Sequence, residues 1–283
     1  MPNVAITSQS GYNAQILTMS HCLTVKRGYY VDYQAPENLL TDRIILVSGA
    51  GDGIGKEAAL TYARHGATVI LLGKTVRKLE ATYDAIVAQG GQEPAIIALD
   101  MMGATGQHYQ QIAESIREQF GRLDGALLNA GILGVLSPLA QYDEKTWREV
   151  MQVNVTAQFL LAQALLPLLH AAPSASLVFT SSSVGKKGRA FWGAYAVSKF
   201  ATEGMMQVLA DELENTQVRV NCINPGGTRT GMRAKAFPAE NPELLKTAAE
   251  IMPVYLYLMG DDSKQENGQS FDAQPNRLPG IAR

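Results

Sequence analysis

The chain has 283 residues, and its 24 basic and 26 acidic side chains nearly cancel, leaving a net charge of −2 at pH 7. Its 46% hydrophobic content can fill a full core, and one α/β domain of ordinary size accounts for the length. No global field favours a nucleic acid or an anionic membrane, so we expect neither as a partner. The longest apolar stretch, residues 159–169, is short of the roughly 18 residues that suggest a membrane span.

The cysteine and histidine content argues against a disulfide-stapled or metal-bound scaffold. Two cysteines, Cys22 and Cys222, give no disulfide framework, and the four scattered histidines have no metal-ligand spacing. We therefore expect no metal. Residues 1–34 lack the apolar core of a secretory signal, and we expect them to be a flexible or mis-annotated extension of a cytoplasmic protein. Residues 35–283 are expected to form a single domain.

Short apolar runs alternate with longer helical patterns along that domain. Six runs are expected to be strands: residues 44–47, 69–72, 95–99, 126–128, 177–179 and 218–223. Helical patterns fill every gap between them. This alternation predicts an α/β fold with a single Rossmann-type, doubly wound parallel sheet and helices on both faces. Binding sites in such folds lie at the carboxyl ends of the strands.

A glycine-rich turn follows the first expected strand. Gly49, Gly53 and Gly55 have the spacing G-x-x-x-G-x-G, with Asp52 and Ile54 between them. Positions without a Cβ let the backbone approach a pyrophosphate at the N-terminus of the next helix. The order strand, turn, helix therefore indicates a dinucleotide site, although a methyltransferase could use the same turn.

The end of the second expected strand bears on the choice of cofactor. An NAD site places an acidic residue there to accept a hydrogen bond from the ribose 2′-hydroxyl, but this chain has Lys74. A cation favours a 2′-phosphate instead, and Arg77 could assist. We expect NADP(H), with NAD(H) as the alternative. Asp52 is a complication, because an anion facing the phosphate would weaken its binding, and a solvated lysine in a turn is the plain alternative for Lys74.

Tyr195 and Lys199 are four residues apart in an expected helix, which places a phenol and an ammonium on one face. A phenol titrates near ~10, so proton transfer at neutral pH needs a fixed cation nearby. At about 4 Å and an effective dielectric of about 20, such a cation is worth at most ~4 kcal/mol. We therefore expect Lys199 to lower the pKa of Tyr195 by up to about three units. Ser182, at the end of the fifth expected strand, adds a hydroxyl.

Taken in order, these motifs resemble the classical short-chain dehydrogenase/reductase family. The glycine turn looks like that family's cofactor turn, and residues 129–131 look like the support after its fourth strand. Residues 224–226, with Thr230, look like its nicotinamide-side loop. The four residues that match its catalytic set are Asn154, Ser182, Tyr195 and Lys199.

The likeness runs from about residue 40 to about residue 271. Residues 151–155, 181–185 and 271–275 are similar to the YciK-like subgroup of bacterial oxidoreductases, which has no settled substrate. Residues 31–36 look like the beginning of the proteins in that subgroup. We therefore expect a native start near Val31, with an ordinary flexible arm, or an arm that pairs with a neighbouring subunit, as the alternative.

The resemblance implies a reaction and a set of contacts. NADPH would deliver a hydride to a carbonyl carbon while Tyr195, as general acid/base, protonates the oxygen and Ser182 donates a hydrogen bond to it. Lys199 would hold the nicotinamide ribose, Asn154 would anchor a water, and Asn129 would tie strand ends together. The implied cofactor contacts are Gly49, Asp52, Gly53, Ile54, Gly55, Lys74, Asp100, Met101, Asn129, Ala130, Gly131, Tyr195, Lys199, Pro225, Gly226, Thr228 and Thr230.

Several points stay open at this stage. Residues 231–252 are expected to be a substrate lid, or else an irregular loop. The basic residues within 185–192 allow an anionic carbonyl substrate, although solvated rim charges explain them more simply. A homodimer or homotetramer is expected through the helices near residues 147–169 and 194–213. The alternative to an enzyme that acts on small-molecule substrates is a non-catalytic protein that senses NADPH.

Overall fold

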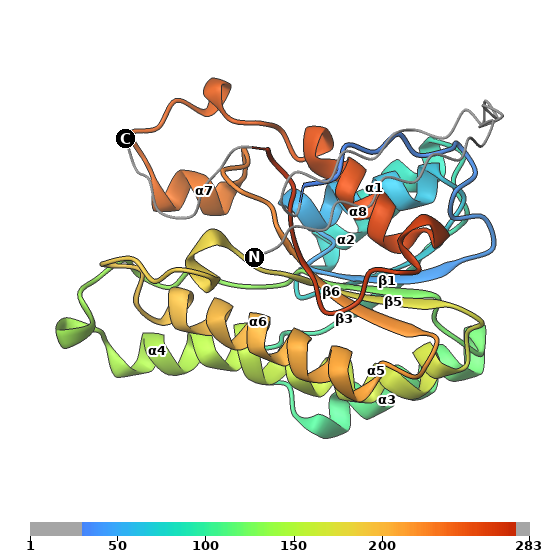
Figure 1. Ribbon diagram of the computed structural model, residues 1–283, viewed down its shortest axis with the longest axis horizontal. Coiled ribbons are helices and arrows are strands. Elements are labelled where there is room, and N and C mark those ends of the chain that lie inside the picture. Colours follow the sequence, from blue (N-terminus) through green and yellow to red (C-terminus); the bar gives the residue numbers. More distant parts are fainter. Residues whose placement is uncertain (1–29, 276–283) are drawn as a thin grey trace, which may run out of the picture.

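Seven parallel strands form the centre of the molecule (Figure 1). The computed structural model describes residues 30–275, so Cys22 and the rest of residues 1–29 lie outside the described part. The strand order is β3-β2-β1-β4-β5-β6-β7, and every neighbouring pair is parallel. The strands are β1 (Ile44–Ser48), β2 (Thr68–Gly73), β3 (Ala95–Ala98), β4 (Gly125–Leu128), β5 (Ala175–Thr180), β6 (Val218–Asn224) and β7 (Ser270–Asp272). The predicted Rossmann-type α/β fold is confirmed.

All six predicted strands are present, whereas β7 escapes prediction. It has three residues, and only its middle residue, Phe271, is buried. Phe271 pairs in register with Ile223 of β6. A run this short carries no periodicity, so the neighbouring strand rather than local sequence makes it a strand.

Helices cover both faces of the sheet (Figure 1). On one face lie α1 (Gly53–Arg64), α2 (Val76–Ala88) and α8 (Met252–Met259). On the other lie α3 (Gly106–Phe120), α5 (Ala157–His170) and α6 (Gly193–Glu212), with α4 (Glu144–Met151) leading into α5. The short helix α7 (Gly231–Ala236) follows β6 and stands outside both layers. Single turns fill the remaining connections: η1 (Leu139–Gln141), η2 (Gln152–Thr156), η3 (Ser183–Gly185), η4 (Pro242–Leu244), η5 (Ala249–Ile251) and η6 (Asp261–Ser263).

Alternate residues of each inner strand enter two different cores. In β1, Ile45 and Val47 pack with α1, α2 and α8, whereas Leu46 packs with α3, α5 and α6. All three side chains are fully buried. Because both faces of the sheet are covered, the strands are largely apolar, which is why runs rather than alternation identified them.

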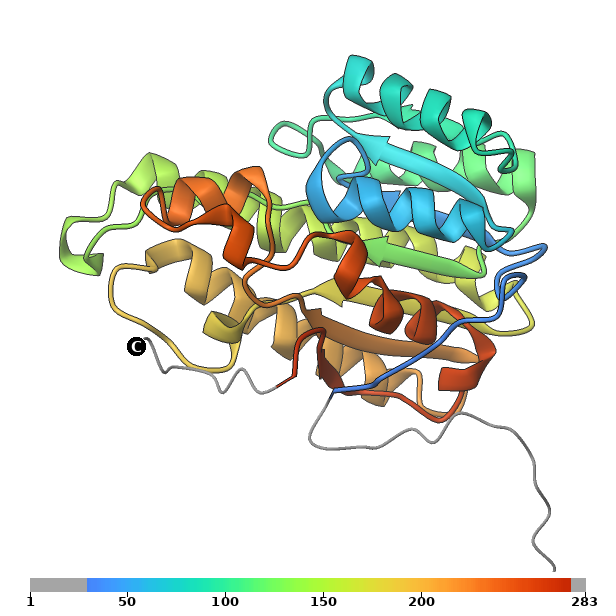
Figure 2. The ribbon, with the colours of Figure 1, turned by 90° about the horizontal axis from the view of Figure 1, so that it is seen from above.

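The chain before β1 is part of the first core. Val31 and Tyr33 are buried, and the Tyr33 ring lies 5.3 Å from that of Tyr257 in α8. Figure 2 shows this segment, in blue, running beside α8, in red. The Tyr33 hydroxyl donates to Asp262 at 2.7 Å. Residues from Val31 onward therefore contribute to the packing of the fold.

One helical stretch of the described chain, Glu144–His170, is long and apolar enough to cross a membrane by length and composition. It joins α4, the π-helical turn η2 and α5, so it is longer than the apolar run visible in the sequence. Half of its most apolar window is buried inside the protein, and α5 packs against α3 and the sheet. The core helix of a globular protein has these properties.

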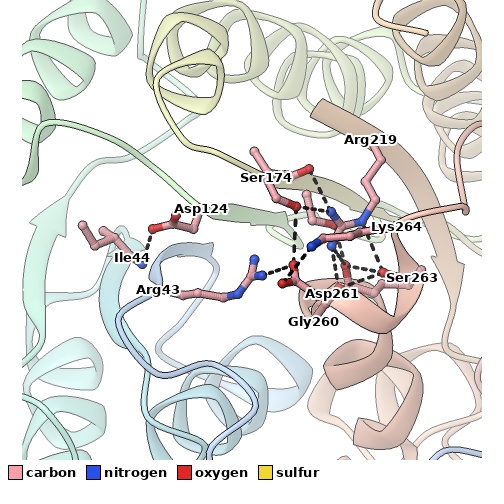
Figure 3. A network of polar contacts seen from close by, with 12 residues as sticks. Arg43, Ile44, Asp124, Ser174, Arg219, Gly260, Asp261, Ser263 and Lys264 are labelled. Atoms are coloured by element: carbon pink, nitrogen blue, oxygen red, sulfur yellow. Dashed lines mark hydrogen bonds and ion pairs between the residues drawn. The ribbon is translucent and has the colours of Figure 1, made fainter. Parts of the chain in front are cut away.

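A polar network holds the amino-terminal ends of the strands together (Figure 3). Arg219, the second residue of β6, is 5% exposed. Its guanidinium donates to the carbonyl of Gly260 at 2.6 Å and to the Ser263 hydroxyl at 3.2 Å. It also donates to the Ser174 hydroxyl at 3.0 Å. Asp261, in the same turn, forms an ion pair with Arg43 just before β1. The network thus joins β1, β5 and β6 to the turn after α8.

We expect Arg219→Ala to lower the free energy of unfolding by about 3 kcal/mol, because it removes several buried hydrogen bonds from a charged donor. Arg148→Ala is the matched control. Arg148 pairs with Glu144 on an exposed face of α4, and such pairs contribute only about 0.5 kcal/mol. Urea denaturation of both variants measures the difference. Equal losses in the two would contradict a stabilising role for the Arg219 network.

Candidate active site

The glycine turn lies between the carboxyl end of β1 and the start of α1. Gly49 has a φ of 71°, and a Cβ at Gly55 would come within 2.3 Å of the Gly49 carbonyl oxygen. The turn therefore tolerates no side chain at Gly55. Asp52 caps α1 by accepting a hydrogen bond from the Gly53 amide at 2.7 Å. The backbone of the glycine turn lies at the N-terminus of α1. This arrangement fits a dinucleotide pyrophosphate.

The carboxylate of Asp52 is neutralised by a residue that the sequence analysis passed over. Lys78, in the first turn of α2, lies 2.5 Å from it, and this contact lowers the pKa of Asp52. Because Lys78 pairs with it, the Asp52 carboxylate would repel a bound phosphate less than an unpaired carboxylate would. Lys74 and Arg77 are exposed at the same end of β2 and start of α2. Three cations thus gather at the expected ribose edge of the turn.

Asn129 joins three strand ends. Its amide nitrogen lies 3.4 Å from the Ser48 carbonyl at the end of β1, and its side-chain oxygen accepts from the Thr180 hydroxyl of β5 at 3.1 Å. The backbone amides of Asn129 and Ala130 both donate to the Ser48 hydroxyl, at 2.9 and 3.0 Å. The prediction that Asn129 ties adjacent strands together agrees with these contacts.

Asp100 and Met101 lie just beyond β3. Asp100 is exposed, and its carboxylate accepts from the Met102 amide at 3.0 Å. Met101 is buried, with its sulfur 3.8 Å from the side-chain nitrogen of Gln158. The Gln158 nitrogen also donates to the Ala130 carbonyl at 2.8 Å. Met101 is thereby connected to the segment after β4.

Asn154 lies in the π-helical turn between α4 and α5 and is 1% exposed. Its side-chain oxygen accepts from the Ile132 amide at 2.8 Å, and its nitrogen donates to the Ile132 carbonyl at 2.9 Å. The same nitrogen donates to the Ser198 hydroxyl of α6 at 3.0 Å. A Cβ at Gly131 would lie 3.2 Å from the Asn154 oxygen and 3.9 Å from the Lys199 nitrogen. Asn154 therefore fixes the loop after β4 against α6.

Ser182, Tyr195 and Lys199 converge beyond the end of β5. The Ser182 hydroxyl lies close enough to the Tyr195 phenol to lower its pKa. The Lys199 ammonium donates to the Thr180 carbonyl at 2.7 Å and lies 5.6 Å from the centre of the Tyr195 ring. Tyr195 is 9% exposed and Lys199 is 6% exposed. The structure brings together three of the four predicted catalytic residues, with Asn154 behind them through Ser198.

Burial controls the ionisation of both groups. It raises the pKa of Tyr195 to about 12, against a smaller lowering by Ser182. It lowers the pKa of Lys199 to about 8, against the charges of Cys222 and Glu203. The prediction that Lys199 brings the phenol's pKa below its usual value is therefore wrong for this arrangement. Desolvation of the phenol outweighs the lowering by Ser182.

The loop after β6 faces the glycine turn. Gly226 has a φ of 70°, and a Cβ at Gly53 would lie 3.5 Å from the Thr230 methyl group. Thr230 caps α7 by accepting from the Arg233 amide at 3.2 Å, and the Thr228 hydroxyl donates to the Pro225 carbonyl at 3.1 Å. The two walls that would enclose a dinucleotide are thus adjacent.

Two further buried residues support the site, and neither was singled out in the sequence analysis. Gln274 is 5% exposed, and its amide donates to the carbonyls of Pro225 and Gly227 at 2.8 and 3.0 Å. Glu203 lies one turn after Lys199 on α6 and accepts from the hydroxyls of Ser181 and Ser270. The i, i+4, i+8 spacing of Tyr195, Lys199 and Glu203 was a visible signal for the latter.

Within residues 30–275, no three His, Cys, Asp or Glu side chains are grouped as metal ligands. The Cys222 thiol is free and buried in β6. The candidate site therefore consists of the glycine turn, the strand-end residues, the loop after β6 and the side chains of α6 named above.

Known proteins match this chain over most of its length. The short chain dehydrogenase family matches residues 43–241. An uncharacterized oxidoreductase, YciK of Escherichia coli strain K12, is 59% identical over 251 residues, which cover 89% of this chain and 99% of that protein.

Two solved structures carry a nucleotide. A short chain dehydrogenase from Escherichia coli CFT073 complexed with NADPH is 60% identical, with a TM-score of 0.84, over 85% of this chain and 100% of that one. A counterpart from Shigella flexneri 2a complexed with NADP is 59% identical, with a TM-score of 0.83, over 85% and 100%. The chain belongs to the short-chain dehydrogenase family and is an oxidoreductase acting on CH–OH and C=O groups with NAD(P).

Proposed function

We propose that this protein is an NADP(H)-dependent oxidoreductase that interconverts small carbonyl compounds and alcohols, with Tyr195 as its general acid/base. The observation that carries the proposal is the convergence of Tyr195, Ser182 and Lys199 beside the turn that fits a dinucleotide. The two relatives complexed with NADP and NADPH support the choice of cofactor. NAD(H) is the alternative cofactor.

The predicted contacts divide by part of the cofactor. The glycine turn (Gly49, Asp52, Gly53, Ile54 and Gly55) would hold the pyrophosphate, and Lys74 would bind the 2′-phosphate. Asp100 and Met101 would border the adenine, with residues 129–131 beneath the ribose. The loop residues Pro225, Gly226, Thr228 and Thr230 would border the nicotinamide, and Lys199 would hold its ribose.

The ionisation of Tyr195 favours its use as an acid. With a pKa of about 12, the phenol is protonated at neutral pH and can donate to an oxygen that gains negative charge. When bound, the cofactor supplies the hydride that reduces the carbonyl carbon. Ser182 would donate a second hydrogen bond to the same oxygen, and the Lys199 ammonium would stabilise the phenolate left behind. In oxidation, the phenolate would take the proton back.

Other parts of the proposal concern the surroundings of the site. We propose that residues 35–283 act as one domain and that residues 231–252 form a lid.

We also propose a homodimer or homotetramer, because α5 and α6 expose the apolar side chains of Phe159, Phe200 and Val208. A cytoplasmic location agrees with the free thiol of Cys222.

Tyr195→Phe should lower kcat by about 10²–10⁴-fold, because a general acid of this kind contributes that much. NADPH affinity should stay within about threefold, since the phenyl ring still fills the space. NADPH consumption with a carbonyl panel and NADPH fluorescence measure the two effects. Tyr83→Phe, whose hydroxyl meets Glu93 on the exposed side of α2, is the control.

The sensor alternative gives a different pattern in the same experiment. A protein that only binds NADPH shows saturable binding and no turnover in either direction, with or without the Tyr195 hydroxyl. Loss of NADPH binding in Tyr195→Phe would show that the tyrosine is architectural.

Lys74→Ala should reduce kcat/KM for NADPH by about 10–100-fold and leave kcat/KM for NADH within about threefold. The reason is that a charge-assisted hydrogen bond to the 2′-phosphate contributes about 1.5–3 kcal/mol. Lys145→Ala, on exposed α4, controls for the loss of one surface charge. An unchanged ratio of the two specificity constants would move the 2′-phosphate contact to Arg77 or Lys78.

A further inference from the structure

Three aromatic rings stand in a row at the candidate general acid. The Trp192 ring centre lies 5.8 Å from that of Tyr195, and the Phe237 ring centre lies 5.8 Å from that of Trp192. Trp192 immediately precedes α6, whereas Phe237 follows α7 in the expected lid. Both are half-buried, so each ring also has accessible surface. The lid thus reaches the tyrosine through aromatic contact.

Apolar side chains border one side of Tyr195. Leu133, Val184 and Ala196 form a small buried cluster with Tyr195, and Trp192 and Ala236 pack against it. They come from the segment after β4, from η3, from α6 and from α7. A group bound to the Tyr195 hydroxyl would therefore meet hydrocarbon on this side.

The cations that suggested an anionic substrate have surroundings other than the Tyr195 ring. The Lys186 ammonium donates to the Ser270 carbonyl at 3.3 Å and lies 3.7 Å from the Asp272 carboxylate in β7. Arg189 lines a surface cavity with Val197 and Phe200, on the flank of α6 away from Tyr195. Lys187 is exposed to solvent.

Arg233, the lid cation beside Phe237, is also paired. The Arg233 guanidinium covers the Phe237 ring at 3.9 Å and forms two contacts of 2.6 Å with Glu240. Its charge is balanced by that carboxylate, and its flat face holds the Phe237 ring in place.

We propose that the substrate is an uncharged carbonyl compound with a ring, whose ring packs on Trp192 and Phe237. This deepens the proposed function and rests on it. A carbonyl oxygen within hydrogen-bond reach of Tyr195 brings its substituents to Trp192. A carboxylate packed on these rings would lose its hydration, and the Arg233 guanidinium beside Phe237 is already paired with Glu240. Ring packing contributes about two- to tenfold in affinity beyond area burial.

The test compares matched substrates. Benzaldehyde and acetophenone should have at least about tenfold higher kcat/KM with NADPH than their 4-carboxylate analogues. Trp192→Ala and Phe237→Ala should each lower kcat/KM for the aryl substrates about tenfold, and for acetaldehyde less than about threefold. Leu244→Ala is the control, because Leu244 lies in the same lid segment but is 80% exposed. A preference for the carboxylates, or equal losses for aryl and aliphatic substrates, would overturn the proposal.

A binding readout separates this proposal from the catalytic one. The chain has two tryptophans, so Trp147→Phe leaves Trp192 as the single indole fluorophore. Acetophenone should change the fluorescence of that variant in the presence of NADP, and 4-carboxyacetophenone should not. If this holds without any turnover, the catalytic proposal fails and the aromatic site stands. If neither compound changes the fluorescence, the aromatic site fails.

A second inference comes independently from Glu203. This carboxylate is 7% exposed, one turn beyond Lys199 on the same face of α6. It accepts a hydrogen bond from Ser181, next to Ser182, and another from Ser270 of β7 at 2.8 Å. We infer that Glu203 is a positioning residue, which holds the end of β5 in place and keeps Lys199 charged.

The charged and titratable groups around Glu203 come from each element packed on it. Lys199 lies on α6, Cys222 on β6 and Asp272 on β7, while Lys186 follows η3. The charge of Glu203 raises the pKa of Lys199 against the lowering by burial, and with burial it raises the pKa of the Cys222 thiol. Because the Lys199 pKa is about 8, loss of this carboxylate acts near neutral pH.

Glu203→Gln should move the alkaline limb of the kcat/KM profile to lower pH. At pH 8 we expect a loss of about fivefold, and at pH 6 a change within about twofold, because Lys199 is protonated there in both proteins. Glu212→Gln, on the exposed end of α6, is the control. A purely structural role predicts a lower melting temperature with an unmoved profile, which would overturn the inference, as would a uniform loss at every pH.

Discussion

The end of β5 holds the candidate site together. The carbonyl of Thr180 accepts from Lys199, and its hydroxyl donates to Asn129. Ser181 donates to Glu203, and Ser182 meets the phenol of Tyr195. Three consecutive residues thus bind a cation, a strand-end amide, a buried carboxylate and the candidate acid. Because β5 pairs with β4 and β6 along its length, the whole sheet fixes the position of its carboxyl end.

That arrangement depends on a fold whose main features follow from local sequence. Short apolar runs identified six strands, because a parallel sheet covered on both faces buries most residues of its inner strands. The glycine turn could be recognised in the sequence because the turn requires glycine at position 55, where a Cβ would collide with the backbone. Helical spacing placed Tyr195 and Lys199 on one face.

The features that escaped prediction depend on contacts between distant segments. β7 is a strand because β6 lies beside it, and Gln274 matters because the loop after β6 folds back onto it. The pairing of Asp52 with Lys78 needs α2 to start near the glycine turn. The pKa of Tyr195 could not be obtained from its spacing to Lys199, because the burial that raises it is produced by the assembled site.

Two buried cations at opposite ends of the sheet show how stability and chemistry are separated. Arg219 at the amino-terminal end donates to several carbonyls and hydroxyls, and although burial lowers its pKa to about 10, it stays charged at neutral pH. Lys199 at the carboxyl end donates to the carbonyl of Thr180, and burial lowers its pKa to about 8. A lysine whose folded pKa is below its unfolded value destabilises the fold at neutral pH, and this cost disappears as the pH rises from 8 to the unfolded value. A loss of stability of this kind is retained at sites where a charge is needed for function. At Lys199 it coincides with the convergence of Tyr195, Ser182 and the glycine turn.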